Sequence, residues 1–297
     1  MMQNFIMRPY RTFAIRIGIF LITGLLLLGC SAARFGYSNG ETLSYWWLNG
    51  YVHFDADQNP WVKKQIATLF AWHRKTQLKS YVQLMSDAQH RVQRNVTEAE
   101  VLADHDRVKK YILLLVDKAL PQLADLALSL KPEQIANIEK KFASNNDDYR
   151  KDYLRGDIEK RQHFRYKKVL KQAEYWFGSF SPEQERKIRA ASDARPLNNE
   201  LVLADRLQRQ AALIALLKKI QTEKPGREAV MAMLKDYAAS VADSFANPEH
   251  KMFFDASRIG WARMVVVIIN NATPAQKDHF IKTLQQWIGD FNALSAA

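Results

Sequence analysis

Hydrophobic residues recur at steps of three and four along almost the whole chain beyond residue 60. This spacing places them on one face of an α-helix, and the period-two alternation of a half-buried strand is nearly absent. Six hydrophobic stripes of this kind are present, over residues 62–70, 108–119, 135–153, 203–217, 230–245 and 280–291. The pattern predicts an all-α fold, an irregular multi-helix bundle of about eight or nine helices.

One short run departs from this pattern. Residues 264–269 are rich in β-branched side chains, which favour a strand by propensity. No partner strand is evident in the sequence, so we assign the run to a buried helix over residues 256–270. This helix is too short to cross a membrane.

Several predicted helix starts share one local sequence, in which a cap and a proline are followed by a glutamine. In two copies Ser181 and Thr273 are capping residues, and the proline after each occupies the first helical position, where a missing N–H has no cost. Gln184 and Gln276 then fall at the third helical position and complete a capping box.

Two further copies are less regular. Lys131 replaces the cap in the copy that ends at Gln134, and Asp55 restores a cap in the loose copy that ends at Gln58. The copies are unevenly spaced, which argues against a regular solenoid. Two interpretations stay open: ordinary helix N-termini, or a repeated signature with a function.

The N-terminal region has the features of an export signal. An apolar run over residues 17–28 follows three arginines and ends at Cys30, the only cysteine of the chain. The sequence Leu27-Leu28-Gly29-Cys30 resembles a bacterial lipobox, which implies removal of a signal peptide over residues 1–29 and acylation of Cys30, with palmitate among the acyl chains. Ser31 is not aspartate, which resembles an outer-membrane address and implies a lipid-anchored protein that faces the periplasm.

These features divide the chain into three parts. We expect a lipoprotein signal peptide over residues 1–29, a lipid-anchored tether and aromatic entry segment over residues 30–59, and a helical domain over residues 60–297. The helical domain is either one bundle or two loosely joined bundles with a seam near residues 178–200. Two Asn-Gly pairs predict turns in the entry segment, at residues 39–40 and 49–50.

Charge narrows the choice of partners. The signal carries three arginines and no acidic residue, so its removal lowers the net charge from +12 to +9. This charge favours anionic partners such as anionic lipid or acidic segments of unfolded polypeptide clients. The exported compartment excludes nucleic acid as a partner, and the membrane itself is a partner through Cys30.

The most basic segment runs from residue 140 to residue 171 and interleaves aromatic residues with its cations. It could form a surface for anionic lipid or acidic clients, or a solvated helix whose aromatic residues are core. The basic residues that we select as surface candidates are Arg150, Lys151, Arg155, Lys160, Arg161, Arg165, Lys167 and Lys168.

Signals of enzyme chemistry are absent from the sequence. The histidines show no helical pair typical of a zinc site, and no nucleophile elbow, phosphate-binding loop or dinucleotide fingerprint occurs. We therefore predict a protein that is not an enzyme, with no catalytic residue, no metal and no cofactor.

Two family resemblances refine this view. Tyr45-Trp46-Trp47-Leu48, Asp57-Gln58 and the triplet Trp72-His73-Arg74, together with the lipobox, resemble an uncharacterised family of proteobacterial lipoproteins, a domain of unknown function. This resemblance implies an all-helical lipoprotein with no assigned activity.

The repeated helix starts resemble the Leu-Thr-x-x-Gln signature of Spy-like periplasmic chaperones, which hold unfolded clients without ATP. The matching positions are Leu130, Glu133 and Gln134, then Phe180, Glu183 and Gln184, although neither copy has the leucine-threonine pair. The leading hypothesis is a non-enzymatic, lipid-anchored envelope lipoprotein with a partner-binding or structural role. An ATP-independent periplasmic chaperone is the first alternative and a peptidoglycan-acting enzyme is the second.

Overall fold

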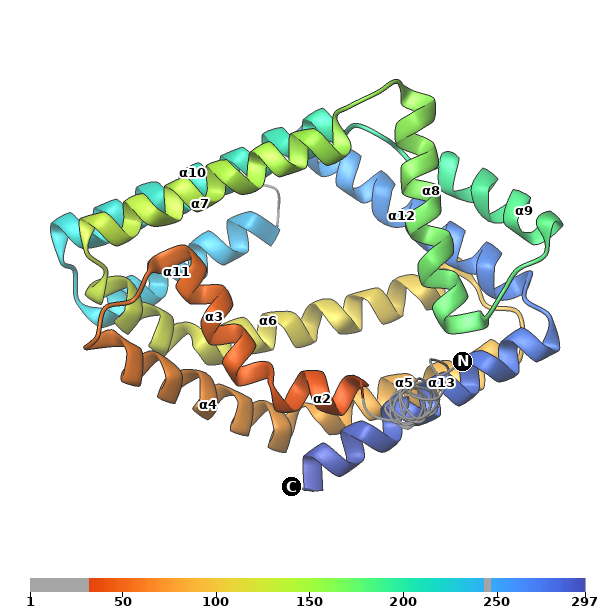
Figure 1. Cartoon of the computed structure of the whole chain (residues 1–297), viewed down its shortest axis with the longest axis horizontal. Coiled ribbons are helices and arrows are strands. Elements are labelled where there is room, and N and C mark those ends of the chain that lie inside the picture. Colours follow the sequence, from red (N-terminus) through yellow and green to blue (C-terminus); the bar gives the residue numbers. More distant parts are fainter. Residues whose placement is uncertain (1–31, 243–246, 297) are drawn as a thin grey trace, which may run out of the picture.

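The computed structural model describes residues 32–242 and 247–296, and these residues form twelve helices and no strand (Figure 1). The helices are α2 (Ala32–Ser38), α3 (Gly40–Val52), α4 (Gln58–Thr76), α5 (Leu78–Val92), α6 (Glu98–Ser129), α7 (Pro132–Tyr153), α8 (Ile158–Phe177), α9 (Pro182–Asp193), α10 (Asn199–Glu223), α11 (Arg227–Ala242), α12 (Pro248–Asn270) and α13 (Pro274–Ala296). None of these described helices combines the length and the apolar character that a membrane crossing requires.

The all-α class is confirmed, but the predicted count of eight or nine helices was wrong. The pair at residues 39–40 does separate α2 from α3, whereas the pair at residues 49–50 lies inside α3. Helices α4 and α5 meet at Gln77, which is neither proline nor glycine and therefore gave no local signal of a break. The assigned helix over residues 256–270 is confirmed as part of the longer α12.

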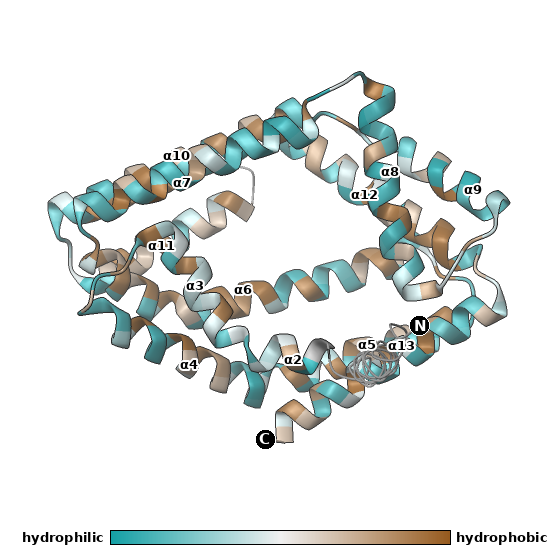
Figure 2. Ribbon diagram, in the orientation of Figure 1, coloured by the Kyte–Doolittle hydropathy of each residue, from teal (hydrophilic) through white to brown (hydrophobic). Residues whose placement is uncertain are grey.

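The helices are arranged as an elongated frame (Figure 1). Helix α5 packs along α13 on one long side, and α7 packs along α10 on the other. Helix α6 runs lengthwise between these sides and contacts α11 and α12, while α8 packs on α9 at one end. Figure 2 shows hydrophobic and hydrophilic residues on the same helices, as expected for amphipathic elements that bury one face each.

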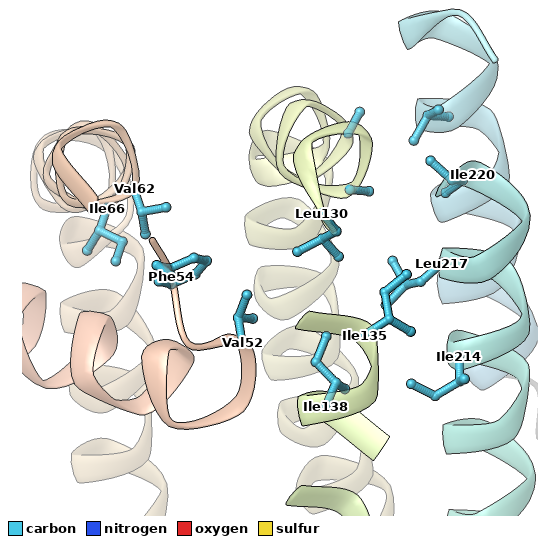
Figure 3. Close-up of a cluster of buried hydrophobic side chains, with 13 residues drawn as sticks. Val52, Phe54, Val62, Ile66, Leu130, Ile135, Ile138, Ile214, Leu217 and Ile220 are labelled. Carbon is cyan, nitrogen blue, oxygen red and sulfur yellow. The ribbon is translucent and has the colours of Figure 1, made fainter. Parts of the chain in front are cut away.

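Two main hydrophobic cores lie at opposite ends of the frame. The first joins α3, α4, α7 and α10, where Val52, Phe54, Ile135 and Leu217 pack together (Figure 3). The second surrounds the C-terminal half of α8 and includes buried residues from α9 and α12. Each core lies beside a pair of helix N-termini that carries the repeated glutamine.

At the first core, the side chains of Gln58 and Gln134 bind each other. Gln134 donates to the Gln58 Oε1 at 2.6 Å, and Gln58 donates back to the Gln134 Oε1 at 3.2 Å. Lys131 has no acceptor with which to cap α7, but its ammonium lies 2.9 Å from a carboxylate oxygen of Asp55, the cap of the opposite start. Lys131, which replaces the cap at the start of α7, therefore links this helix start to that of α4.

At the second core, Gln184 and Gln276 form the equivalent reciprocal pair. The Gln184 amide donates to the Gln276 Oε1 at 2.8 Å, and the reverse bond measures 3.2 Å. The predicted capping boxes are present at both helix starts, with Ser181 and Thr273 as caps. We call each reciprocal glutamine pair a bracket, because it joins two helix N-termini that are far apart in sequence.

Candidate functional site: a basic and aromatic cleft along helix α8

A cleft of about 860 Å³ lies between α8, α12 and α13. Its size is within the range of small-molecule sites, which is roughly 300–1,000 Å³. Six cations line it: Arg155, Lys160, Arg161, Arg165, Lys168 and Arg195. The remaining lining is largely apolar and aromatic, with Val169, Ala173, Trp176, Phe177, Trp261, Met264, Val265, Ile268, Ile269, Phe280 and Leu284.

The predicted basic residues separate into two groups. Five of them line the cleft: Arg155, Lys160, Arg161, Arg165 and Lys168. Arg150 and Lys151 instead lie at the end of α7, where each pairs with an aspartate three residues earlier. Lys167 is exposed on α8, with its ammonium 5.7 Å from the centre of the Tyr166 ring. The aromatic residues are divided as well, because Tyr166 and Phe177 are buried core while Phe164 is exposed.

Four of the six cations have no carboxylate within ion-pairing distance among the described residues. Arg161 lies 2.6 Å from a carboxylate oxygen of Glu200, and Lys160 lies 3.8 Å from one of Asp157. Arg155, Arg165, Lys168 and Arg195 form no ion pair with the described residues. The cleft therefore carries a local excess of positive charge.

The two acidic residues of the lining do not cancel this excess. Asp104 is engaged by the guanidinium of Arg91. Asp152 is exposed at the end of α7. An anionic ligand in the cleft would therefore meet cations that the protein itself leaves uncompensated.

Arg165 uses its guanidinium to hold the chain that follows α9. It donates to the carbonyl oxygens of Pro196 at 2.8 Å and Ser192 at 2.7 Å, and to that of Arg195 at 3.2 Å. A cation at the C-terminal carbonyls of a helix interacts favourably with the helix dipole. Burial, and then repulsion from Arg195, lower the pKa of Arg165.

Arg195 is the cation of the cleft that sequence reasoning missed. It lies in the loop after α9 and packs across Gly260 of α12, where an added Cβ would come within 3.2 Å of the arginine Cγ. The only hydrogen bond that its guanidinium makes with the described residues is a long contact of 3.9 Å to the sulfur of Met264, and its Nε is buried without a partner. Burial lowers the pKa of Arg195, as expected for a cation that lacks a counter-charge. Gly260, which lies between the large apolar residues Ile259 and Trp261, was the one available signal.

Lys168 is held by aromatic residues. Its ammonium donates to the hydroxyl of Tyr153 at 2.7 Å and lies 4.3 Å from the centre of the Phe164 ring and 4.5 Å from that of Tyr153. Tyr153 in turn stacks on Tyr149 at a centroid distance of 4.7 Å. The aromatic residues therefore position this cation at the rim of the cleft.

Polarity in the cleft changes along the axis of α8. Four of the five lining residues in the N-terminal half of this helix, from Lys160 to Lys168, are basic, and the fifth is Phe164. Those of the C-terminal half, from Val169 to Phe177, are largely apolar. A helix rises about 1.5 Å per residue, so the apolar half extends over about 12 Å. The cleft is thus basic at one end and apolar at the other.

A second, larger cleft of about 1270 Å³ lies between α6, α10, α11 and α12. Helix α6 presents Val108, Ile112, Leu113 and Leu123 to it, and all four are partly exposed, with Ile112 at 57%. Charged residues of both signs lie in its lining. This cleft offers apolar surface without the charge asymmetry of the first.

His73, the central residue of the triplet that resembles a family motif, has a structural role. His73 lies between two tyrosines, 2.9 Å from the hydroxyl of Tyr37 and 3.0 Å from that of Tyr81, so that each ring nitrogen has a partner. Burial lowers the pKa of His73. Within the described ranges, no three His, Cys, Asp or Glu side chains are grouped closely enough to hold a metal ion. Cys30 and the expected signal peptide over residues 1–29 lie outside the described residues.

Fold and site together define an all-α protein with a cleft that is basic at one end and apolar at the other. Residues 50–241 match the model of a family of unknown function, DUF6279, and the chain belongs to this family. The match agrees with the expected membership of an uncharacterised family, and it ends before α12 and α13, which build one wall of the basic cleft. No curated protein and no solved structure matches the chain.

Proposed function

We propose that this chain is a lipid-anchored protein of the bacterial cell envelope that acts without catalysis, by binding anionic partners in the basic cleft. The observation that supports binding is the presence of four cations without carboxylate partners around an apolar interior. Two of these cations, Arg165 and Arg195, are partly buried, which is unfavourable for a charge unless a ligand supplies the counter-charge.

The proposed anchor is Cys30, acylated in the outer membrane with the helical body in the periplasm. Its support comes from the lipobox and from the position of α2, which begins at Ala32. An acyl anchor two residues earlier would hold the body close to the bilayer. The exposed aromatic residues Phe35, Trp46 and Trp47 on α2 and α3 would suit the membrane interface. The proteobacterial lipoprotein resemblance belongs to this proposal.

Two experiments test the two halves of this proposal. Radiolabelled palmitate should enter the wild-type chain in cells and not the Cys30→Ala variant, and equal labelling of both would eliminate the anchor. For the binding half, the probe is the anionic dye 8-anilinonaphthalene-1-sulfonate, added to the full chain in phosphatidylcholine nanodiscs with empty discs as blank.

The dye should bind the wild type more tightly than a variant carrying Arg155→Gln and Lys168→Gln, because both changes remove a cation from the cleft rim. Lys167→Gln is the matched control, since Lys167 is an exposed cation of the same helix that does not line the cleft. If dye affinity is the same in all three proteins, the cleft does not bind anions and this half of the proposal is wrong.

An ATP-independent chaperone is the second candidate, favoured by the apolar side chains that α6 presents to the larger cleft. The resemblance to Spy-like chaperones supports it less, because the matching glutamines are occupied in the brackets. The full chain in nanodiscs should suppress aggregation of an unfolded client, and Ile112→Asp should weaken this protection. Absence of protection at a large molar excess would eliminate this candidate.

A further inference from the structure

Two guanidiniums of the basic cleft have no oxygen acceptor among the described residues, those of Arg155 and Arg195. Arg155 is exposed to water, whereas Arg195 is partly buried, so its hydrogen-bonding capacity is largely unused. Arg165, Lys168 and Arg161 all donate to oxygen atoms of the protein. Arg195 has no oxygen acceptor among the described residues, and its contact to the sulfur of Met264 is weak. A guanidinium offers a planar fork of donors that matches a carboxylate or phosphate group. Arg195 is therefore the group best placed to bind an anionic headgroup.

The position of Arg195 is maintained by its surroundings. Arg165 holds the loop through its three hydrogen bonds to carbonyl oxygens, one of which is the carbonyl of Arg195 itself. On the other side, Gly260 leaves the space into which the arginine stem packs. Arg165 acts here as a positioning residue, and Arg195 is the one that would contact the ligand.

The separation of polarity in the cleft selects the kind of ligand. The apolar half along α8 extends over about 12 Å, and an acyl chain of one bilayer leaflet spans roughly 15 Å, half of the hydrocarbon core. Trp176, Phe177 and Phe280 lie in the lining of this apolar half. A polypeptide presents charged and apolar side chains mixed along its length, whereas a lipid-like molecule has its charge at one end.

We propose that this cleft binds a single-chain amphiphile with an anionic carboxylate or phosphate headgroup, with the headgroup at Arg195 and the chain along the apolar half of α8. The inference rests on the proposed function, in which the cleft binds anions, and it names the class of ligand.

The test uses the full chain in phosphatidylcholine nanodiscs and measures displacement of 8-anilinonaphthalene-1-sulfonate. Dodecanoate and dodecyl phosphate should displace the dye. Acetate and inorganic phosphate, which have the headgroup alone, and dodecan-1-ol, which has no charge, should do so only at far higher concentration. Each methylene added between octanoate and dodecanoate should strengthen binding by up to roughly fourfold, the value for full burial of one CH₂.

Variants then separate the headgroup from the chain. Arg195→Gln should weaken dodecanoate binding roughly 10- to 100-fold, the range expected for a lost hydrogen bond to a charged group, and leave dodecan-1-ol unchanged. Gly260→Ala keeps the charge but crowds the arginine stem, and should give a smaller loss. Lys167→Gln should leave the binding of both ligands unchanged. Circular dichroism and thermal melts establish that each variant is folded.

The position of the chain is tested by cross-linking. Dodecanoate with a diazirine at its last carbon should label Trp176, Phe280 or Leu284, and mass spectrometry locates the adduct. The inference would be overturned by labelling along α6 instead. It would also be overturned if Arg195→Gln weakened the binding of dodecanoate and of dodecan-1-ol equally. If dye binding depends on the rim cations but no acyl probe displaces the dye, the proposed function stands and the proposed class of ligand is wrong.

Discussion

Removing the carboxamide of Gln276 should destabilise this protein far more than removing an exposed glutamine of the same helix. The side chain is only 9% exposed and makes four hydrogen bonds. Its Oε1 accepts from the backbone N–H of Thr273 and from the amide of Gln184, both at 2.8 Å. Its Nε2 donates to the carbonyl of Ser179 at 2.6 Å and to the Oε1 of Gln184 at 3.2 Å.

The size of the effect follows from these four bonds. A typical intramolecular hydrogen bond contributes about 0.5–1.5 kcal/mol net, and a buried group left without its partner costs more. Substitution by alanine also removes half of the capping box at the start of α13. We therefore expect Gln276→Ala to lower the free energy of unfolding by roughly 2–4 kcal/mol.

A double-mutant cycle with Gln184→Ala tests whether the bracket acts as one unit. Gln184 has its own bonds to the N–H of Ser181 and the carbonyl of Asn271. Two bonds are shared by both glutamines, so the double variant should lose less stability than the sum of the single variants. The coupling should lie within the roughly 0.5–3 kcal/mol found for residues in one network.

Urea unfolding followed by circular dichroism measures these changes. Gln286→Ala is the control, because Gln286 is exposed on the same helix and makes no hydrogen bond with the described residues. It should change the free energy of unfolding by no more than about 0.5 kcal/mol. The reasoning would be refuted if Gln276→Ala matched this control, or if the two bracket variants were additive.

Two further predictions use the same unfolding assay. Gly178 ends α8 with φ 75° and ψ −167°, a conformation nearly restricted to glycine, so Gly178→Ala should lower the free energy of unfolding by about 1–3 kcal/mol. Gly289 lies inside α13 with open space at the Cβ position, so Gly289→Ala should raise the free energy of unfolding by about 0.5–1 kcal/mol. Arg94 and Thr97 lower the pKa of Glu100 from 4.5 to about 2, so its stabilising contribution is complete above pH 4.5 and is lost as the pH falls towards 2. The stability difference between wild type and Glu100→Gln should therefore shrink over that range and stay constant above it; a difference that is the same at pH 2 and pH 6 would contradict this.

The sequence predicted those parts of the fold that depend on neighbouring residues. Helical spacing and capping residues act within one turn or two, so the all-α class and the capping boxes at Ser181 and Thr273 could be read directly. The number of helices could not be read in this way. Gln77 interrupts an otherwise continuous helical pattern, and it is buried by residues that are distant in sequence. Pairing of the glutamines was equally hidden, since Gln184 and Gln276 are 92 residues apart.

The same distinction explains which parts of the candidate site were foreseen. The cations of α8 lie close together in sequence, and five of the eight candidates line the cleft. Arg195 belongs to no basic cluster and reaches the cleft only because α9 folds back on α8 and Gly260 allows a close approach. A residue whose importance comes from its lack of partners leaves little trace in a sequence, because the missing partner is visible only in three dimensions.

The bracket at Gln184 and Gln276 also determines the geometry of the basic cleft. Helix α9 leads from Gln184 to the loop that carries Arg195, and α13 leads from Gln276 to Phe280 and Leu284, one and two turns further on. The headgroup side and the apolar side of the cleft are therefore attached to the two helices whose starts the bracket joins. A change in the distance between these starts would move Arg195 relative to Phe280. The repeated glutamines would thus contribute indirectly to the binding that we propose, by fixing the spacing of the cleft walls. A sequence signature at helix starts can in this way be tied to a candidate site that contains neither glutamine.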